Sequence, residues 1–193
     1  MQPEWKHPGT LPIQTPRLLL RRFTTGDAPA MFRNWASDPQ VTRCLSWAPH
    51  KAVADTKAYL QALTARYRQP DTYDWCMEWK ETGEPIGSIG AVRTDGALRS
   101  AHVGYCMARA LWGRGIMTEA LAAVEDFLFA RAGCNRIESM HHVENPASGR
   151  VMQKTGMRLE GIQRQAALNN RGEPVDIALY AILRADWEAL GRS

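Results

Sequence analysis

Apolar and polar side chains alternate along this chain in a pattern that predicts mixed strands and helices. Helical spacing of apolar residues indicates one helix over 55–68 and another from Thr118, where Leu121, Val124 and Leu128 share a face before Gly133. Short apolar runs between Gly, Pro and Asn turns predict strands at 17–23, 75–80, 85–92, 101–107, 136–143, 157–167 and 175–183.

Three shorter helices are predicted at 25–38, 145–156 and 186–190. Thr25 and Asp27 are N-cap candidates for the first, which ends near Asp38-Pro39. Asn145 is expected to cap the second, with Pro146 in the first turn, where a missing N–H is harmless. The order of strands and helices, without repeats or low-complexity linkers, predicts one mixed α/β domain.

A glycine-rich segment joins the strand at 101–107 to the helix from Thr118. Its sequence is Trp112-Gly113-Arg114-Gly115-Ile116-Met117-Thr118. Two glycines one residue apart permit a tight turn, and the freed N–H groups and the helix dipole then favour an anion, usually phosphate. A dinucleotide fingerprint needs a third glycine at the position of Thr118, and no Gly-Lys-Ser/Thr is present. A plain structural turn remains the alternative for an isolated Gly-x-Gly.

The surrounding motifs favour the phosphate interpretation. They are Gly104-Tyr105, Trp112 to Gly115, Thr118 to Leu121, Asn145 to Ser148 and Lys154 to Met157. Together they resemble the GCN5-related N-acetyltransferase family, most closely its ribosomal-protein N-acetyltransferase-like branch. The resemblance spans residues 15–190 and implies an N-terminal extension over 1–14 followed by one acetyltransferase domain. Its expected fold is a mixed, mostly antiparallel sheet flanked by helices.

That resemblance implies acetyl-CoA as co-substrate and a primary amine as acceptor, either a protein N-terminus or a small molecule, attacking directly in a ternary complex. The glycine segment would bind the pyrophosphate, with Arg114 as its cation, and the strand before it would pair with the pantetheine. Asn145 would touch the pantetheine as well as cap its helix. The implied cofactor contacts are Cys106, Met107, Ala108, Trp112, Gly113, Arg114, Gly115, Ile116, Met117, Thr118, Asn145 and Ser148.

The implied catalytic residues are His102, Ser148 and Glu144. Many relatives place a tyrosine acid seven residues after the asparagine, where this chain has Met152. Ser148 or water then protonates the leaving thiolate, or the thiolate leaves unaided, since its pKa is about 8.5. Where the branch has a glutamate base, this chain has His102, whose imidazole titrates near neutral pH. Glu144 is the reserve base, and a purely structural role for His102 stays open.

Composition narrows the remaining classes. The chain has 193 residues, 45% of them apolar, which suits one domain, and no apolar run or leader-like stretch indicates a membrane. We therefore expect a cytoplasmic monomer or homodimer. Its net charge of +4 suits an anionic ligand, but it lacks a basic stripe or a nucleic-acid motif, so no direct nucleic-acid partner is expected.

No metal site is expected. Cys44, Cys76, Cys106 and Cys134 form no CxxC pair, and His141 and His142 alternate across a strand. Four aromatic residues are core candidates that stay open as an acceptor pocket: Trp35, Trp47, Tyr59 and Trp75. Two rival functions also remain, an acyl-CoA sensor without turnover and a nucleotide-binding regulator.

Overall fold

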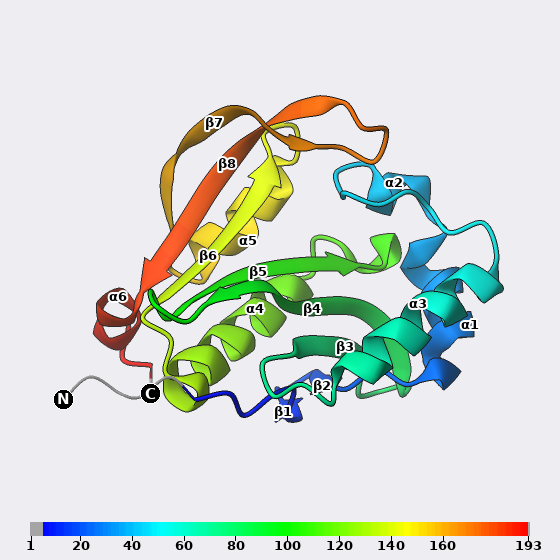
Figure 1. The fold of residues 1–193 in the computed structure, drawn as a ribbon, viewed down its shortest axis with the longest axis horizontal. Coiled ribbons are helices and arrows are strands. Elements are labelled where there is room, and N and C mark those ends of the chain that lie inside the picture. Colours follow the sequence, from blue (N-terminus) through cyan, green and yellow to red (C-terminus); the bar gives the residue numbers. More distant parts are fainter. Residues whose placement is uncertain (1–5, 193) are drawn as a thin grey trace.

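The fold is one eight-stranded sheet with helices on both faces, as the computed structural model of residues 6–192 shows (Figure 1). In the sheet the strand order is β1-β2-β3-β4-β5-β6-β8-β7. Every neighbouring pair is antiparallel except β5 with β6, which is parallel. The strands are β1 (Ile13–Gln14), β2 (Leu18–Arg21), β3 (Tyr73–Trp79), β4 (Glu84–Asp95), β5 (Ser100–Met107), β6 (Arg136–His142), β7 (Arg158–Leu168) and β8 (Pro174–Leu183). The expected fold class is confirmed; residues 1–5 of the expected extension lie outside the described residues.

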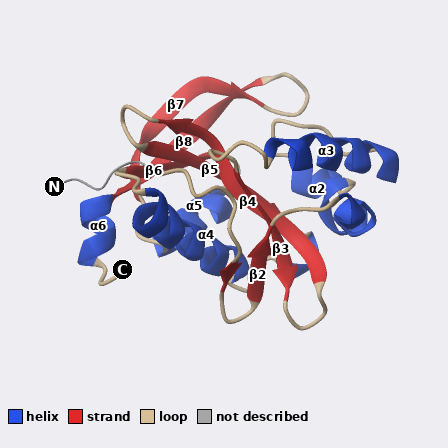
Figure 2. Cartoon of the chain, turned by 60° about the horizontal axis from the view of Figure 1, so that its bottom comes forward, coloured by secondary structure: helices blue, strands red, loops and turns tan. Residues whose placement is uncertain are grey.

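Six α-helices of the described chain cover the sheet. They are α1 (Ala28–Met31), α2 (Pro39–Thr42), α3 (Val53–Arg66), α4 (Ile116–Phe127), α5 (Pro146–Lys154) and α6 (Arg184–Ala189). Figure 2 shows α4, α5 and α6 on one side of the sheet and α2 and α3 on the other. Within residues 6–192 no helix is long and apolar enough to cross a membrane.

The observed elements differ from the predicted ones where short segments escape periodicity. The helix predicted to begin at Thr118 begins two residues earlier, because Gly115 takes a left-handed conformation (φ 72°) as its N-cap. The segment predicted as one helix over 25–38 is divided into a 3-10 turn, the single turn of α1 and a π turn. Strand β1 and helix α2 were not predicted, since two and four residues show no periodicity.

Two apolar clusters hold the layers together. One joins the sheet to α4, α5 and α6 and contains Trp75, Leu121 and Trp187. The other joins it to α1 and α3 and contains Trp35 and Leu60. Burial of each large side chain contributes about 1.5–3 kcal/mol. Trp35 and Trp75 are fully buried, so these two belong to the core and not to an acceptor pocket.

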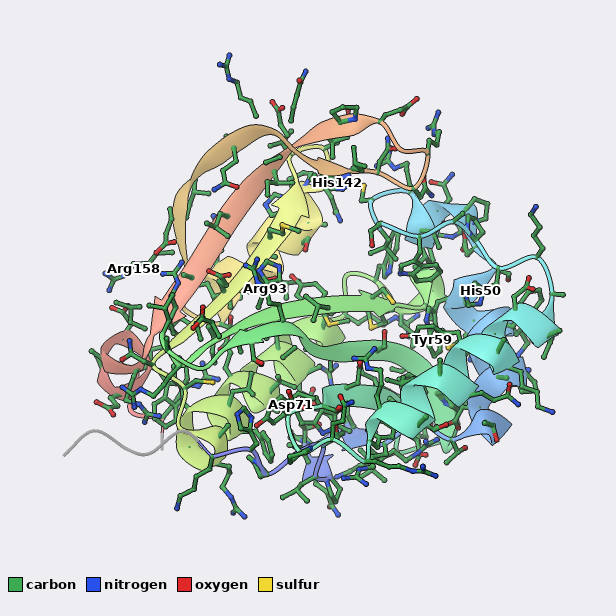
Figure 3. All side chains as sticks on the ribbon, viewed as in Figure 1. His50, Tyr59, Asp71, Arg93, His142 and Arg158 are labelled. Carbon is green, nitrogen blue, oxygen red and sulfur yellow. The ribbon has the colours of Figure 1, made fainter. Side chains whose placement is uncertain are left out.

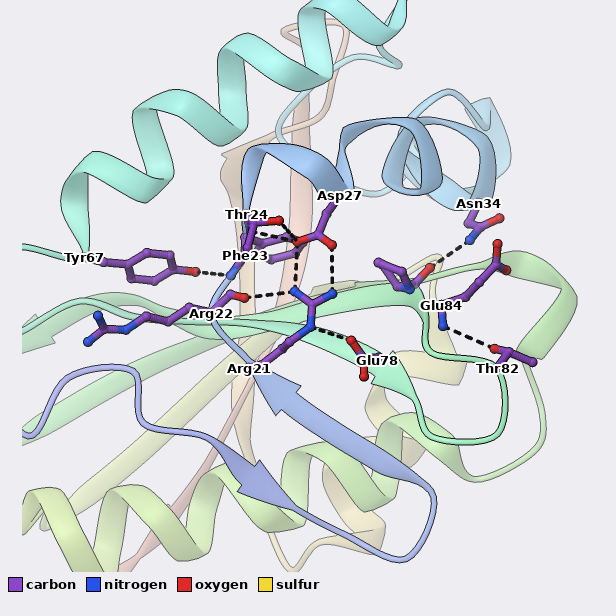
Figure 4. Close-up of polar contacts among 11 residues, drawn as sticks. Arg21, Arg22, Phe23, Thr24, Asp27, Asn34, Tyr67, Glu78, Thr82 and Glu84 are labelled. Atoms are coloured by element: carbon purple, nitrogen blue, oxygen red, sulfur yellow. Dashed lines mark hydrogen bonds and ion pairs between the residues drawn. The ribbon is translucent and has the colours of Figure 1, made fainter.

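An ion-pair network fixes the entry of the chain into α1. The Arg21 guanidinium donates to both carboxylate oxygens of Asp27, at 2.8 and 2.9 Å, and to Glu78 on β3 (Figure 4). Asp27 also accepts from the Thr24 amide at 2.7 Å and so caps the first turn. Burial alone would raise the pKa of Asp27, but these hydrogen bonds hold it below its usual value.

A buried carboxylate connects α4, α5 and the C-terminal segment. Glu125 on α4 is fully buried and accepts from the Thr155 hydroxyl at 2.7 Å and from Arg192 at 2.9 Å. Arg192 also donates to the Thr155 carbonyl and to Asp126. Burial raises the pKa of Glu125 to about 7, although Thr155 and Arg192 oppose the shift. Arg192 therefore holds together two helices whose other ends form the candidate site.

Arg192→Ala should lower the free energy of unfolding by about 3 kcal/mol, because it leaves a buried carboxylate without its cation. The raised folded-state pKa of Glu125 means that stability from this group is full below its unfolded pKa and is lost as pH rises through about 7. Loss of Arg192 raises that pKa further, so the deficit should be larger at about pH 8 than at about pH 5. Urea denaturation at both pH values measures it.

The control is Arg158→Ala. Arg158, labelled in Figure 3, pairs with Asp186 at 2.7 Å but is 75% exposed. Its removal should cost less than about 1 kcal/mol. Equal losses for the two variants, or a pH-independent loss for Arg192→Ala, would contradict this account of the clamp.

Candidate active site

The sheet opens between its two parallel strands. Pairing of β5 with β6 covers only Ser100–His102 against Arg136–Glu138. Figure 1 shows the two strands together at one end and separated at the other. At the point of separation the Ser139 hydroxyl donates to the Val103 carbonyl at 2.8 Å. Beyond it, within residues 6–192, no strand pairs with this edge of β5.

The backbone of β5 beyond His102 points alternately to β4 and to the opening. The Ala108 amide donates to the Ile86 carbonyl on β4 at 2.8 Å. By alternation the backbone groups of Tyr105 and Met107 face the opening. The Met107 carbonyl accepts from the Trp112 indole at 3.0 Å. The expectation that the Ala108 amide would pair with a ligand is therefore wrong, because β4 already uses it.

The glycine segment forms the tight turn that its sequence predicts. Gly113 and Gly115 have φ values of 76° and 72°, a region that other residues rarely adopt. Helix α4 follows at once, so the unpaired amides of its first turn stand beside those of the turn. This is the geometry of an anion site.

Arg17 and Glu119 fasten this turn to the start of β2. The Glu119 carboxylate accepts from the Arg17 Nε at 2.6 Å, from the Arg17 amide at 2.9 Å and from the Thr15 hydroxyl at 2.6 Å. Arg17 Nη1 donates to the Arg114 carbonyl at 3.0 Å. Arg114, expected as the cation of the turn, has an exposed side chain, whereas the Arg17 guanidinium lies against the turn.

One cavity of about 320 Å³ joins the turn, the open edge of β5 and the start of α5. The sequence-predicted residues in its wall are Cys106, Met107, Trp112, Gly113, Gly115, Ile116, Met117, Thr118, Asn145 and Ser148. Four others that the sequence singled out are not in the wall: Ala108, Arg114, His102 and Glu144.

Two hydroxyl groups meet inside this cavity. The phenol oxygen of Tyr105 lies 2.9 Å from Ser148 Oγ and donates to the Ser148 carbonyl at 3.2 Å. Both residues line the cavity, Tyr105 from β5 and Ser148 from the first turn of α5. Burial raises the pKa of Tyr105 strongly, although the bond with Ser148 opposes the shift. The phenol is protonated at every pH at which the protein is folded.

Comparison with known proteins places this arrangement. The model of the acetyltransferase (GNAT) domain matches residues 17–158. The chain belongs to the GNAT acetyltransferase family. It is 31% identical to the uncharacterized N-acetyltransferase YoaA of Bacillus subtilis over 172 residues, 89% of this chain and 96% of that protein. The enzyme is thus an acyltransferase.

Two further relatives belong to the branch that the sequence resembles. The ribosomal-protein-serine acetyltransferase of Escherichia coli is 32% identical over 105 residues, 54% of this chain and 58% of that protein. The solved structure of RimL, a ribosomal L7/L12 α-N-protein acetyltransferase in complex with coenzyme A, has a TM-score of 0.80 at 22% identity, covering 90% of this chain and 98% of that one. The latter likeness supports the fold.

His102 lies in this acetyltransferase where β5 and β6 part. It is 9% exposed, and its Nδ1 is 3.4 Å from Glu138 Oε1. Glu138 also accepts from Arg93 at 3.0 Å and from Arg136. Burial lowers the pKa of His102, although Glu138 opposes the shift. The imidazole is neutral near pH 7 and thus able to accept a proton, but it stands outside the cavity wall.

Asn145 begins α5 but does not cap it in the predicted way. Its side chain forms no capping hydrogen bond, and its φ and ψ of −114° and 64° differ from those of an ordinary N-cap. The Ser148 amide is bound instead by the Asn145 carbonyl at 3.1 Å. The capping prediction is therefore wrong, and the Asn145 side chain lines the cavity.

The outer wall of the cavity comes from segments without motifs. The α2 segment contributes Gln40 to Leu45, except Thr42, whose carbonyl accepts from Asn170 at the tip of the β7–β8 hairpin, at 3.1 Å. Figure 3 shows His142, at the end of β6, near this junction. Within the described residues no cluster of three metal-ligating side chains occurs.

Sequence reasoning missed several wall residues. Arg150 and Lys154 on α5 lie in the wall, and their spacing of four residues was a usable signal for one helix face. Tyr105 was visible in the Gly104-Tyr105 motif but received no role. Its partner Ser148 is 43 residues away, so only the fold brings the two together.

Gly149→Ala tests how tightly α5 is seated on β6. A Cβ there would lie 2.6 Å from His141 Nε2, and His141 is fixed by its stacking on Tyr180 and by a 2.7 Å contact with the His142 carbonyl. Glycine to alanine in a helix usually stabilises by about 1 kcal/mol. Here the clash should reverse the sign and cost about 1–3 kcal/mol.

Urea denaturation measures this change, with Arg150→Ala as the control on the same helix. Arg150 is exposed, so its removal should change the free energy of unfolding by less than about 0.5 kcal/mol. A Gly149→Ala variant as stable as the wild type would show that α5 moves freely over His141.

Proposed function

We propose that this enzyme transfers the acetyl group of acetyl-CoA to a primary amine by direct attack in a ternary complex. The observation that supports it most is the continuity of the cavity. One end is the anion-binding turn at Gly113–Thr118, and the other is the Tyr105–Ser148 hydroxyl pair. Between them lies the open edge of β5. A phosphate, an extended amide-bearing arm and a thioester would meet these three regions in that order.

Acetyl-CoA is the co-substrate. Its pyrophosphate is bound by the amides of the glycine turn and the first turn of α4. Its pantetheine amides pair with the backbone groups of Tyr105 and Met107 that face the opening, which otherwise lack a strand partner. The Asn145 side chain, which lines the cavity and is not used in capping, contacts the same arm.

In the reaction, the amine nitrogen bonds to the acetyl carbon, the carbon–sulfur bond breaks, and the electron pair stays on sulfur. Ser148 donates a hydrogen bond to that sulfur as charge develops. The amine must lose a proton, either to His102 through water or to Glu144. Glu144 is exposed in the turn before α5 and stays the second candidate.

The acceptor is a protein N-terminus or a small amine. Its entrance would lie between the α2 segment and the β7–β8 hairpin, which touch through Asn170 and Thr42. Likeness to ribosomal-protein acetyltransferases supports a protein N-terminus as the first substrate to test. Action in the cytoplasm remains a prediction.

The decisive assay measures CoA release from acetyl-CoA with a panel of peptides and small amines, with intact-mass detection of the acetylated product. Gly115→Val is the matched variant, because a branched side chain at φ 72° strains the turn and stands where the phosphate would bind. Its affinity for CoA, measured by calorimetry, should fall at least about tenfold, the loss of one charge-assisted hydrogen bond.

Acetyl-CoA bound without turnover across the panel would favour the sensor over the enzyme reaction proposed here. Unchanged CoA affinity in folded Gly115→Val would place the phosphate elsewhere.

A pH profile tests His102. If its neutral form is the base, activity should decline as pH falls through a pKa below the usual 6.5, because burial lowers the pKa of His102. An acceptor amine of high pKa keeps its own titration out of that range. His102→Gln keeps hydrogen bonding but cannot take the proton, so kcat should fall about 10²-fold or more with unchanged CoA affinity.

Glu144→Gln is the comparison variant and should leave kcat within a few-fold. A fall of less than about threefold in His102→Gln, against the 10²-fold expected of a base, would return His102 to a structural role beside Glu138.

A further inference from the structure

The Tyr105–Ser148 pair has one feature that the proposed reaction does not yet use: two alternative hydrogen-bond patterns. The phenol has one proton and two acceptors, Ser148 Oγ at 2.9 Å and the Ser148 carbonyl at 3.2 Å. When the phenol donates to the carbonyl, the serine proton can turn back to the phenol oxygen. When the phenol donates to Oγ, the serine proton must point elsewhere, and the cavity is the open direction.

We propose that Tyr105 is a positioning residue that donates its hydroxyl proton to Ser148 Oγ and thereby holds the Ser148 proton toward the sulfur of bound acetyl-CoA. The proposal rests on the proposed function and adds a residue that its chemistry did not require. Tyr105 reaches Ser148 from β5, across the opening, so the pair also connects the two sides of the site.

The protonation of Tyr105 supports this direction of donation. Its buried phenol keeps its proton, since burial raises its pKa well above the usual value. It therefore acts as a constant donor and never as a general acid that ends as tyrosinate. Met152, at the position where relatives have a tyrosine acid, cannot donate, which leaves Ser148 as the hydroxyl beside the opening.

No proton leaves Tyr105 or Ser148 in this scheme. The nitrogen–carbon bond forms as the carbon–sulfur bond breaks, and the electron pair of that bond becomes the thiolate lone pair. The Ser148 hydrogen bond stabilises the thiolate as it forms, and the ammonium proton goes to the base. Since the thiol pKa is about 8.5, the thiolate takes a proton from water after release.

Another tyrosine provides a matched control. Tyr180 on β8 accepts from Gln153 Nε2 at 3.2 Å, so its hydroxyl also bonds to α5, but it does not line the cavity. Tyr180→Phe and Tyr105→Phe thus remove the same oxygen from the same helix interface. Only the second change removes the donor to Ser148.

Steady-state kinetics with the best acceptor separates the two. Tyr105→Phe should lower kcat about tenfold with KM for acetyl-CoA within twofold, because a hydrogen bond that matters most to developing charge is lost. Tyr180→Phe should stay within twofold in both. In the Ser148→Ala background, Tyr105→Phe should have no further effect. A kcat of Tyr105→Phe within twofold of wild type, or an equal fall in both backgrounds, would overturn the proposal.

A second measurement does not depend on turnover. The thiol pKa of bound CoA can be followed by the ultraviolet absorbance of the thiolate, and a Ser148 proton directed at sulfur lowers it. Tyr105→Phe should raise that pKa by about one unit, which corresponds to the tenfold effect, and Tyr180→Phe should not. Equal values in wild type and Tyr105→Phe would overturn the proposal. A raised value without turnover by any variant would support the positioning role while contradicting the proposed transferase reaction.

Discussion

The separation of β5 from β6 is the constraint on which the rest of the structure depends. Two parallel strands that pair over only three residues leave one edge of β5 without a partner in the interior of the protein. Buried backbone amides and carbonyls need partners. The fold satisfies some of them itself, with Ser139 at Val103 and Trp112 at Met107. The remaining groups, at Tyr105 and Met107, explain why an amide-bearing ligand fits here.

The surrounding structure keeps that opening in place. On one side, Glu119 and Arg17 fasten the glycine turn to the start of β2, over a separation of 102 residues. On the other, Arg192 and Glu125 hold α4 to the end of α5 through a buried ion pair. A buried pair of this kind adds little net stability, but breaking it is costly, so it specifies one arrangement of the two helices. Gly149 lets α5 approach β6 closely enough for Ser148 to meet Tyr105.

The sequence predicted what is local. The glycine turn was predictable because Gly113 and Gly115 report their own backbone conformation, and the strands because their turns carry Gly, Pro and Asn. The start of α4 was misplaced, since a left-handed glycine as N-cap has no side-chain signature. The Asn145 cap failed for a related reason: Asn-Pro marks a helix start but does not fix which polar group satisfies the first turn.

What could not be predicted is contact between distant residues. Arg17 against the turn and Tyr105 against Ser148 depend on how β2, β5 and α5 are brought together, which single-sequence patterns do not encode. His102 illustrates the same limit. The motif placed it on the right strand, but only the fold shows that its side chain is held by Glu138 and stands outside the cavity wall.

A crystal structure of the complex with acetyl-CoA tests the central claim most directly. The account predicts the pyrophosphate on the amides of Gly113–Thr118, the pantetheine in the opening between β5 and β6 with its amides on Tyr105 and Met107, and the thioester sulfur beside Ser148. A complex with the phosphates away from the glycine turn, or with the opening empty and the pantetheine on another surface, would contradict it.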